Sequence, residues 1–168
     1  MDCLPLSPGT PHFRAATDRY ATIHGEPVES VRERFTAHTR FDSYRGFVAV
    51  DDAGRVVGYG YGHGSQVGQP YHDRLRETLD ATTYDRWLTD CFELVELGVS
   101  ELRRREGVAT RLHERVFGGV ERATTVLTTE ADNEPARAFY ESHGWSVVRE
   151  PFRVVDTEMV VYGRRLDD

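Results

Sequence analysis

One turn of the chain gathers positive charge around the predicted start of a helix. Val108, Leu112 and Val116 recur at one-turn intervals, so a helix is expected to begin at or just before Gly107. A helix start exposes four backbone N–H groups and carries partial positive charge, which together favour phosphate oxygens. The arginines around this turn are Arg103, Arg104, Arg105 and Arg111. The pattern predicts a phosphate-binding turn; solvated arginines before an ordinary surface helix would explain the same residues.

Two glutamates on the strand before this turn could act as a general base. Glu93 and Glu96 point to opposite faces of a strand, so they cannot serve one site equally. Glu96 lies nearer the end of the strand, among leucines, where partial desolvation would raise its pKa toward the working range of a base. We favour Glu96, acting directly or through a bridging water. A glutamate that only pairs with an arginine is the alternative.

The histidines carry less weight as candidates. His63 and His72 flank a glycine-bearing loop and could line an acceptor pocket, but a surface or hairpin-end position is the stronger expectation. No pair of histidines has the context of a metal site, so we predict no metal.

The elements that would position these residues alternate between strand and helix. Residues 1–12 are expected to be an irregular lead-in, and residues 13–168 a single domain. Expected helices cover 16–24, a segment opening at Pro27, 71–90, 107–117 and 134–142; expected strands cover 46–50, 55–62, 92–99, 124–129, 145–148 and 159–164. This alternation predicts a central sheet with helices on both faces.

The second strand of the predicted hairpin has one nearly bare face. Gly58, Gly60 and Gly62 alternate with Tyr59 and Tyr61, so a helix or a ligand could approach the backbone closely. The two tyrosines, together with the helix expected at 71–90, are predicted to build the acceptor pocket.

Composition excludes several classes of function. The formal charge of -7 argues against general binding to nucleic acid or to an acidic membrane surface. No apolar segment approaches the length of a membrane span, and the two cysteines do not form a disulfide framework. A reduced, cytoplasmic location is expected, and the sequence leaves open whether the protein is a homodimer.

Two segments resemble the GNAT superfamily of N-acetyltransferases. Arg104-Arg-Glu-Gly107-Val-Ala109 looks like the signature (Gln/Arg)-x-x-Gly-x-(Gly/Ala) that follows the family's fourth strand. The segment from Asn133 through Tyr140 to Gly144-Trp145 resembles the second motif of the family, and Asn133 is also expected to cap the helix at 134–142. The similarity is clear over about residues 46–148, whereas the family's first strand could only be Phe13-Arg-Ala15. Glu106 departs from the pattern, because an acid beside a pyrophosphate is unfavourable unless its side chain points away.

The resemblance implies an α/β (α+β) fold with a mixed, mostly antiparallel central sheet that splays between its fourth and fifth strands. It also implies direct transfer of an acetyl group from acetyl-CoA, as co-substrate, to a primary amine of a small molecule or peptide. Tyr140 is the family-matched acid for the leaving thiolate. Glu96, favoured above over Glu93 on the pattern of the strand, is the expected base. The expected donor-binding residues are Leu97, Val99, Arg104, Arg105, Gly107, Ala109, Thr110 and Asn133.

The same residues admit three other interpretations. A longer acyl-CoA could be the donor, or the chain could be a non-catalytic acyl-CoA-binding or sensor domain that keeps the turn. A P-loop nucleotide enzyme is disfavoured, because no Gly-Lys-Ser/Thr follows the turn.

Overall fold

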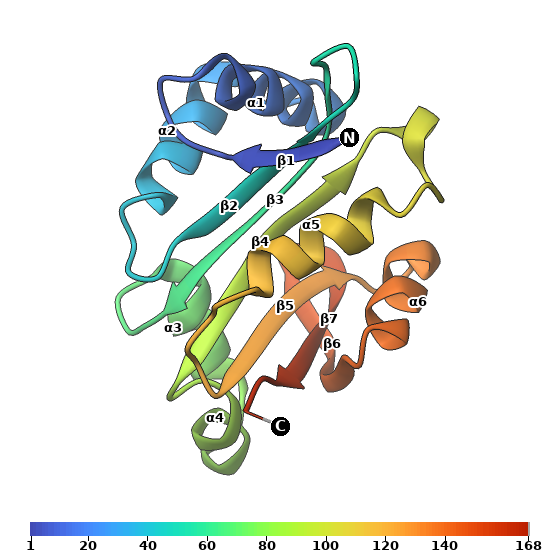
Figure 1. The fold of residues 1–168 in the computed structure, drawn as a ribbon. Coiled ribbons are helices and arrows are strands. Elements are labelled where there is room, and N and C mark those ends of the chain that lie inside the picture. The colour runs from blue at the N-terminus through green and yellow to red at the C-terminus, as the bar shows by residue number, and fades with distance from the viewer. Residues whose placement is uncertain (168) are drawn as a thin grey trace. The chain divides into compact units, whose positions relative to one another are not determined.

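Hydrogen bonds join seven strands in the order β1-β2-β3-β4-β5-β7-β6 within residues 1–167, which the computed structural model describes (Figure 1). The strands are β1 (Asp2–Pro5), β2 (Arg45–Val50), β3 (Val56–Ser65), β4 (Cys91–Val99), β5 (Thr124–Glu130), β6 (Ser146–Val154) and β7 (Thr157–Arg165). The helices are α1 (Pro11–His24), α2 (Val28–His38), α3 (Pro70–Thr78), α4 (Ala81–Trp87), α5 (Val108–Phe117) and α6 (Glu134–Ser142), with a short 3-10 helix η1 (Glu101–Arg103).

The pairing of the strands confirms a mixed, mostly antiparallel sheet. The pairs β1–β2, β2–β3, β5–β7 and β6–β7 are antiparallel, and β4–β5 is parallel. The parallel register covers only Cys91↔Thr124, Phe92↔Thr125 and Glu93↔Val126. The ladder between the fourth and fifth strands therefore ends well before either strand does, as the predicted splay requires.

The chain divides into two compact units, which are described in turn. Unit 1 comprises Met1–His63 and Leu94–Val120, and unit 2 comprises Gly64–Glu93 and the chain from Glu121 onward. Strands β3 and β4 each contribute to both units.

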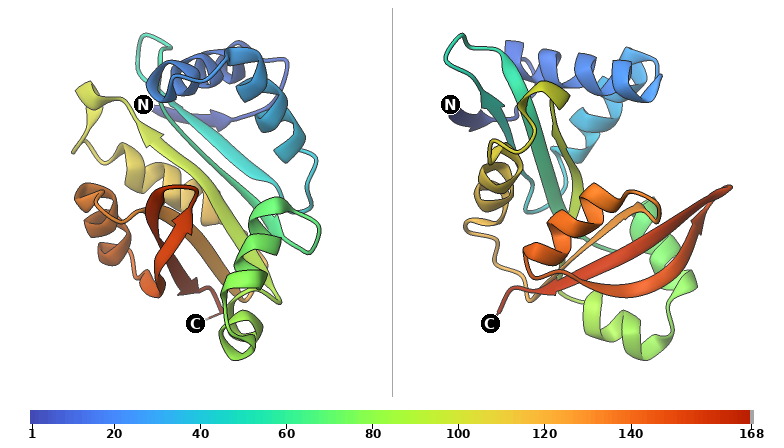
Figure 2. Two further views of the ribbon diagram at one scale, coloured as in Figure 1. Left: turned by 180° about the vertical axis from the view of Figure 1, so that it is seen from behind. Right: turned by 90° about the vertical axis from the view of Figure 1, so that its right-hand side faces the viewer.

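Unit 1 packs α1 and α2 on one face of its strands, as Figures 1 and 2 show. Helix α1 begins where the Thr10 hydroxyl accepts a hydrogen bond from Phe13 N–H (3.1 Å), and it ends at Gly25, whose φ is 64°. The buried aromatic residues between the helices and β3 are Phe13, Tyr20, Phe35, Tyr59 and Tyr61. This aromatic core fixes α1 and α2 over the strands.

Helix α5 covers the bare glycine face of β3. A Cβ atom placed on Gly58 would lie 3.0 Å from Leu112 Cδ1, 3.1 Å from Val108 Cγ1 and 3.0 Å from the carbonyl oxygen of Gly98. The equivalent atom on Gly60 would lie 3.0 Å from Leu97 Cδ1. A helix rather than a ligand therefore occupies the space that these glycines leave.

Unit 2 also has helices on both faces of its strands. Residues from α3 and α4 share a core with Val126, Phe152 and Val161. On the opposite face, Tyr162 accepts a hydrogen bond from Arg137 Nε (3.0 Å) and donates one to Glu141 Oε1 (2.7 Å), both on α6. Helices on both faces of the strands are thus found in each unit.

Several predicted elements have other boundaries in the structure or belong to another type of secondary structure. Residues 1–12 are not irregular throughout, because Asp2–Pro5 pairs with β2 and α1 begins at Pro11. Phe13-Arg-Ala15 lies within α1 and is not the first strand. The helix expected at 71–90 is two helices, because Leu79 is extended and the Asp80 carboxylate caps α4 through Thr83 N–H (2.9 Å). The strand expected at 145–148 continues to Val154.

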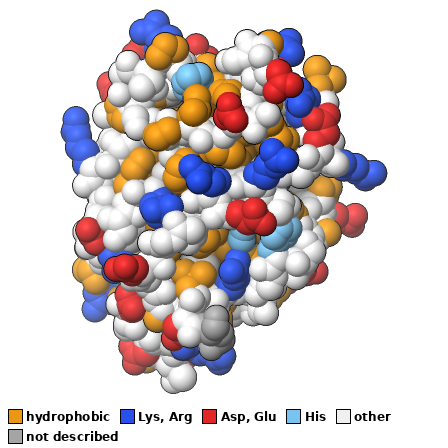
Figure 3. All heavy atoms as spheres, viewed as in Figure 1, with side chains coloured by type: hydrophobic (Ala, Val, Ile, Leu, Met, Phe, Trp, Pro, Cys, Tyr) orange, Lys and Arg blue, Asp and Glu red, His pale blue; other side chains and the backbone are white. Residues whose placement is uncertain are grey.

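The surface mixes both signs of charge. Figure 3 shows arginines and acidic side chains interspersed on the face in view. None of the helices within residues 1–167 is long and apolar enough to span a membrane.

The two strand glycines that face α5 should differ in their tolerance of a methyl group. We expect Gly58→Ala to lower the free energy of unfolding by about 1–3 kcal/mol, since its Cβ meets a fixed carbonyl oxygen as well as two side chains. Gly60→Ala is the matched control and should cost less, because Leu97 Cδ1 can rotate away. Urea denaturation of both variants measures the difference; equal losses would contradict this packing.

Candidate active site

The turn before α5 leaves the start of that helix uncapped by a side chain. Gly107 is the N-cap residue, with φ 76° and ψ 10°, and it has no side chain with which to cap the helix. Arg105 also has a positive φ, of 64°. The backbone here follows a left-handed path at two of three consecutive residues. The exposed N–H groups of the first turn of α5 therefore suit an anionic ligand.

Glu106 turns its carboxylate toward a neighbouring arginine. Arg103 Nε donates to Glu106 Oε2 (2.7 Å), and Arg103 Nη1 lies 3.8 Å from Asp51 Oδ2. The acid that departs from the family pattern is thus neutralised locally. The negative charge of Glu106 is not left uncompensated at the helix start.

The other residues of the predicted donor site lie around the same turn. Arg104 is exposed and 3.8 Å from Glu101, and Arg105 is also exposed. Ala109 and Thr110 are partly exposed in the first turn of α5. The structure brings these residues together with Gly107 in unit 1.

On β4, Leu97 and Val99 pack their side chains against the core beneath α5. Between them, Gly98 lies against an aromatic ring: a Cβ there would be 3.1 Å from both Cζ and Oη of Tyr59. Gly98 therefore makes room for the ring of Tyr59. The pairing of β4 with β5 involves Cys91, Phe92 and Glu93, so Leu97 and Val99 lie beyond that ladder.

Glu96 is half-buried in unit 1, beside α1 and α2. Burial raises the pKa of its carboxyl group from 4.5 to about 7, against the lowering effects of a hydrogen bond from Tyr20 and of the Arg34 guanidinium. Glu26 adds a smaller raising effect on this pKa. A carboxyl group with a pKa near 7 can exchange a proton at neutral pH, which suits a general base.

Glu93 has a different environment. It is 7% exposed and belongs to unit 2, where it pairs in register with Val126. Its charge contributes to the raised pKa of the buried Tyr71, after the larger effect of desolvation. Of the two predicted carboxylates, Glu96 is the one that accompanies the turn in unit 1.

The family-matched residues Asn133 and Tyr140 lie in unit 2. Asn133 Oδ1 accepts a hydrogen bond from Ala136 N–H (3.2 Å), which confirms its predicted role as the cap of α6. Tyr140 is 9% exposed, and its ring packs against Trp145, with 5.8 Å between ring centroids. Their roles toward a donor stay predictions.

The expectation for the two histidines was wrong, since both are buried. His63 is 2% exposed and its ring lies edge-on to Phe41 (4.8 Å). His72 is 1% exposed and is held between Ser65 Oγ and Tyr84 Oη, each at 2.8 Å. The tyrosines predicted for the acceptor pocket are also core residues, because Tyr59 is 3% and Tyr61 is 1% exposed. Helices α3 and α4, which replace the helix predicted beside them, belong to unit 2.

Sequence reasoning missed the residues of α1 and α2 that surround Glu96. The sequence patterns single out neither Tyr20 nor Arg34. Arg34 donates to both carboxylate oxygens of Glu26 (2.8 and 3.4 Å) and lies over the Tyr20 ring (5.3 Å). No local spacing relates these residues to Glu96, since the contact depends on how α1 and α2 fold over β4.

No group of three or more His, Cys, Asp or Glu residues within residues 1–167 is arranged to hold a metal ion.

Comparisons with known proteins agree with this fold. The model of the acetyltransferase (GNAT) family matches residues 13–145. An acetyltransferase of the GNAT family from Staphylococcus aureus Mu50 is similar in structure, with a TM-score of 0.68, 10% identity and 98% coverage of both chains. Ard1 from Thermoplasma volcanium has a TM-score of 0.68 and 16% identity over 98% of this chain and 96% of that chain.

A nourseothricin acetyltransferase is a more distant match, with a TM-score of 0.53 and 14% identity. The similarity covers 73% of this chain and 65% of that protein, which is less than two thirds of its length. No curated protein sequence matches. At such low identities these structures support the fold alone.

The buried carboxyl group of Glu96 should make stability depend on pH. Because its pKa is about 7 when folded and near 4.5 when unfolded, the folded state holds a proton that the unfolded state has lost between these values. Stability is therefore lost as pH rises through this window. Between pH 4 and pH 8, we expect the free energy of unfolding of the wild type to fall by on the order of 1–3 kcal/mol relative to that of Glu96→Gln.

Urea denaturation of both proteins at several pH values tests this expectation. Glu29→Gln, which alters an exposed glutamate on α2, is the control and should leave the pH dependence of the wild type unchanged. A constant difference between Glu96→Gln and the wild type from pH 4 to pH 8 would show that Glu96 titrates normally.

Proposed function

Because this chain belongs to the GNAT family of acetyltransferases, we propose that it moves an acetyl group from acetyl-CoA to a primary amine of a small molecule or peptide. The observation that carries the proposal is the arrangement of unit 1. There, a half-buried glutamate with a pKa near 7 precedes an uncapped helix start on the same strand-turn-helix segment.

The donor is held by the main chain of this segment in our proposal. N–H groups of Arg105, Gly107, Ala109 and Thr110 bind the pyrophosphate, and the guanidinium of Arg104 adds positive charge. The main chain of Leu97 and Val99 pairs with the pantetheine arm, as the family resemblance implies. In unit 2, Asn133 is proposed to contact the same arm on the basis of that resemblance alone.

The reaction is a direct transfer in which each proton has a destination. The amine nitrogen attacks the thioester carbonyl, the new C–N bond forms, and the C–S bond breaks. Glu96 accepts a proton from the amine, directly or through one water. Tyr140 donates a proton to the leaving thiolate; this role rests on its match to the family motif.

Two alternatives remain within the same family. A longer acyl-CoA could replace acetyl-CoA as donor, because the contacts proposed for unit 1 are made to the pyrophosphate and the pantetheine arm and not to the acyl chain. A non-catalytic acyl-CoA sensor would keep the turn and need no base. The raised pKa of Glu96 favours catalysis, because a binding domain gains nothing from a carboxyl group that titrates near pH 7.

Removal of the base or the acid should slow transfer. We expect Glu96→Gln and Tyr140→Phe each to reduce kcat about 10²- to 10⁴-fold in a thiol-release assay with a panel of amines. For the wild type, kcat/KM should rise with pH through an inflection near 7, as Glu96 loses its proton, and Glu96→Gln should lack this inflection. Two acceptors with different amine pKa values separate the protein's titration from the substrate's. Unchanged rates in both variants would refute these roles.

The turn itself can be tested without knowing the acceptor. Gly107→Val should weaken coenzyme A binding tenfold or more in isothermal titration, because a side chain would stand at the helix start and the left-handed backbone would be disfavoured. Gly9→Val is the matched control: its φ is 82° and, as at Gly107, a Cβ meets nothing within 4 Å. Equal weakening in both variants would indicate general strain and count against the turn as the donor site.

A further inference from the structure

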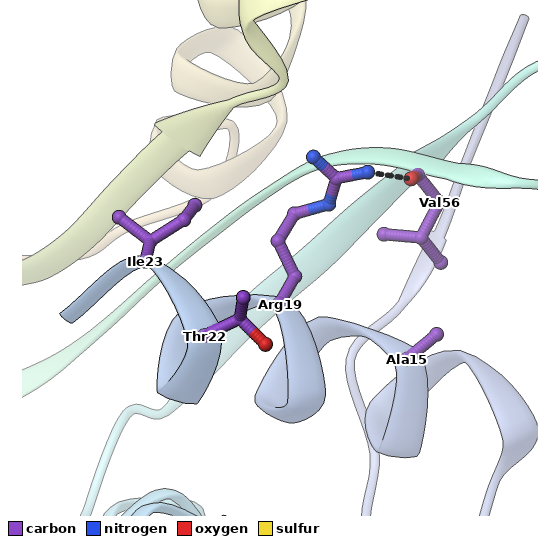
Figure 4. Close-up of a pocket in the computed structure, with 5 residues that line it drawn as sticks. All are labelled: Ala15, Arg19, Thr22, Ile23 and Val56. Carbon is purple, nitrogen blue, oxygen red and sulfur yellow. Dashed lines mark hydrogen bonds between the residues drawn. The ribbon is translucent and has the colours of Figure 1, made fainter. Parts of the chain in front are cut away.

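The segment between β4 and α5 is tied to the start of β3 by its main chain. Ser100 N–H donates to the Val57 carbonyl oxygen (2.8 Å), and Arg103 N–H donates to the Ser100 carbonyl oxygen (2.9 Å). One residue earlier in β3, the Val56 carbonyl oxygen accepts a hydrogen bond from Arg19 Nη2 (3.5 Å), and Figure 4 shows this arginine reaching from α1 to the strand. The start of β3 therefore contacts both α1 and the segment that leads to η1.

Asp51, in the turn of the β2–β3 hairpin, carries a carboxylate that is fixed in place. Its Oδ1 accepts hydrogen bonds from the N–H groups of Ala53 (3.0 Å) and Arg55 (2.9 Å), and its Oδ2 accepts one from Arg55 Nε (2.9 Å). The bonds from Arg55, its main chain first, and then the bond from Ala53 lower the pKa of Asp51. Asp51 is only 8% exposed, so its negative charge is screened less than that of a surface carboxylate.

Arg103 of η1 joins this carboxylate to the turn before α5. Its Nη1 lies 3.8 Å from Asp51 Oδ2, and its Nε donates to Glu106 Oε2 at 2.7 Å. The side chain of Arg103 is 31% exposed, against 64% for that of Arg104 at the next position. The guanidinium of Arg103 therefore lies between two acids, whereas that of its neighbour is largely exposed.

The backbone around Glu106 is strained. Glu106 stands between Arg105 and Gly107, whose φ angles of 64° and 76° are both left-handed. A residue with a side chain, such as Arg105, adopts this conformation at a cost in free energy, and the conformation persists where surrounding contacts hold it. The bond from Arg103 to Glu106 spans the strained residue. It is thus placed to hold the conformation that sets the start of α5.

We infer that Arg103 is a positioning residue for the donor site: it ties Glu106 to Asp51 and thereby holds the turn in the conformation that binds the diphosphate. This inference rests on the proposed function and adds to it a pair of acids that never touch the ligand. It also gives a reason for Glu106, the acid that departs from the family pattern. Glu106 is needed to receive Arg103.

Neutralising either acid gives a prediction whose sign separates this role from simple electrostatics. If charge alone decides, removal of a negative charge near a diphosphate strengthens its binding. We expect the opposite: Asp51→Asn and Glu106→Gln should each raise the Kd of coenzyme A about threefold or more in isothermal titration, because each removes one contact of Arg103. Arg103→Gln should raise this Kd about 5- to 30-fold, and the KM for acetyl-CoA with it, while kcat changes little.

Arg55→Gln is the matched control. It removes another guanidinium that contacts Asp51 Oδ2, at 2.8 Å, and leaves the turn before α5 untouched, so the Kd of coenzyme A should equal that of the wild type. Arg103→Lys should recover part of the affinity, because it retains the positive charge. In the double variant Asp51→Asn/Arg103→Gln, the loss of affinity should not exceed that of Arg103→Gln alone, because both changes break the same chain of contacts.

The outcomes distinguish this inference from the function on which it rests. If the wild type gives no heat with coenzyme A, the proposed function is refuted. If the wild type binds coenzyme A and the two acid variants bind it equally well or more tightly, the inference is overturned and acetyl transfer stands. Equal weakening in Arg55→Gln and Arg103→Gln would trace the loss to the hairpin as a whole and would overturn the inference as well.

Discussion

The burial of the Glu96 carboxyl group is the constraint on which the proposed chemistry depends. The carboxylate of Glu96, whose charge raises the pKa values of Tyr20, Tyr59 and Tyr61, loses hydration by burial, and its own pKa rises to about 7. The hydrogen bond from Tyr20 and the charge of Arg34 oppose this rise, so the group still ionises near neutral pH. Burial without these partners would raise the pKa of Glu96 further, and the partners without burial would lower it.

The alternating pattern of β3 creates that environment and positions the turn at the same time. Its tyrosines build the aromatic core under α1 and α2, and its glycines admit α5 on the other face. Because α5 begins at Gly107, close packing of this helix on Gly58 also fixes the place of the uncapped helix start. The alternation of tyrosine and glycine on this one strand thus positions both the proposed base and the helix start within unit 1.

The features that were predicted correctly from the sequence are those that interactions between neighbouring residues determine. The start of α5 at Gly107, the β2–β3 hairpin and the cap of α6 by Asn133 follow from spacing, turn residues and capping side chains. The strand β1 was missed because its pairing with β2 is a contact across more than forty residues. The break at Leu79–Asp80 was missed because apolar spacing continues through it.

The burial of His63 and His72 was missed because a polar residue enters a core only when tertiary partners satisfy it. For His72 those partners are Ser65 and Tyr84. The contact of Tyr20 with Glu96 belongs to the same class, since it joins α1 to β4 and no local rule relates the two positions.

In this protein, the positions of individual charged side chains indicate ligand binding better than the net charge does. The chain has 28 acidic residues and 21 arginines, so acidic partners outnumber the arginines that could pair with them. Arg19 is half-buried, and its guanidinium makes one long hydrogen bond, to the Val56 carbonyl oxygen, among the described residues. Its positive charge is therefore poorly compensated. Arg105, exposed at a left-handed position beside the helix start, is likewise without an ion pair among the described residues. An acidic protein that leaves a cation unpaired beside the proposed phosphate site is suited to a ligand that supplies the missing anion.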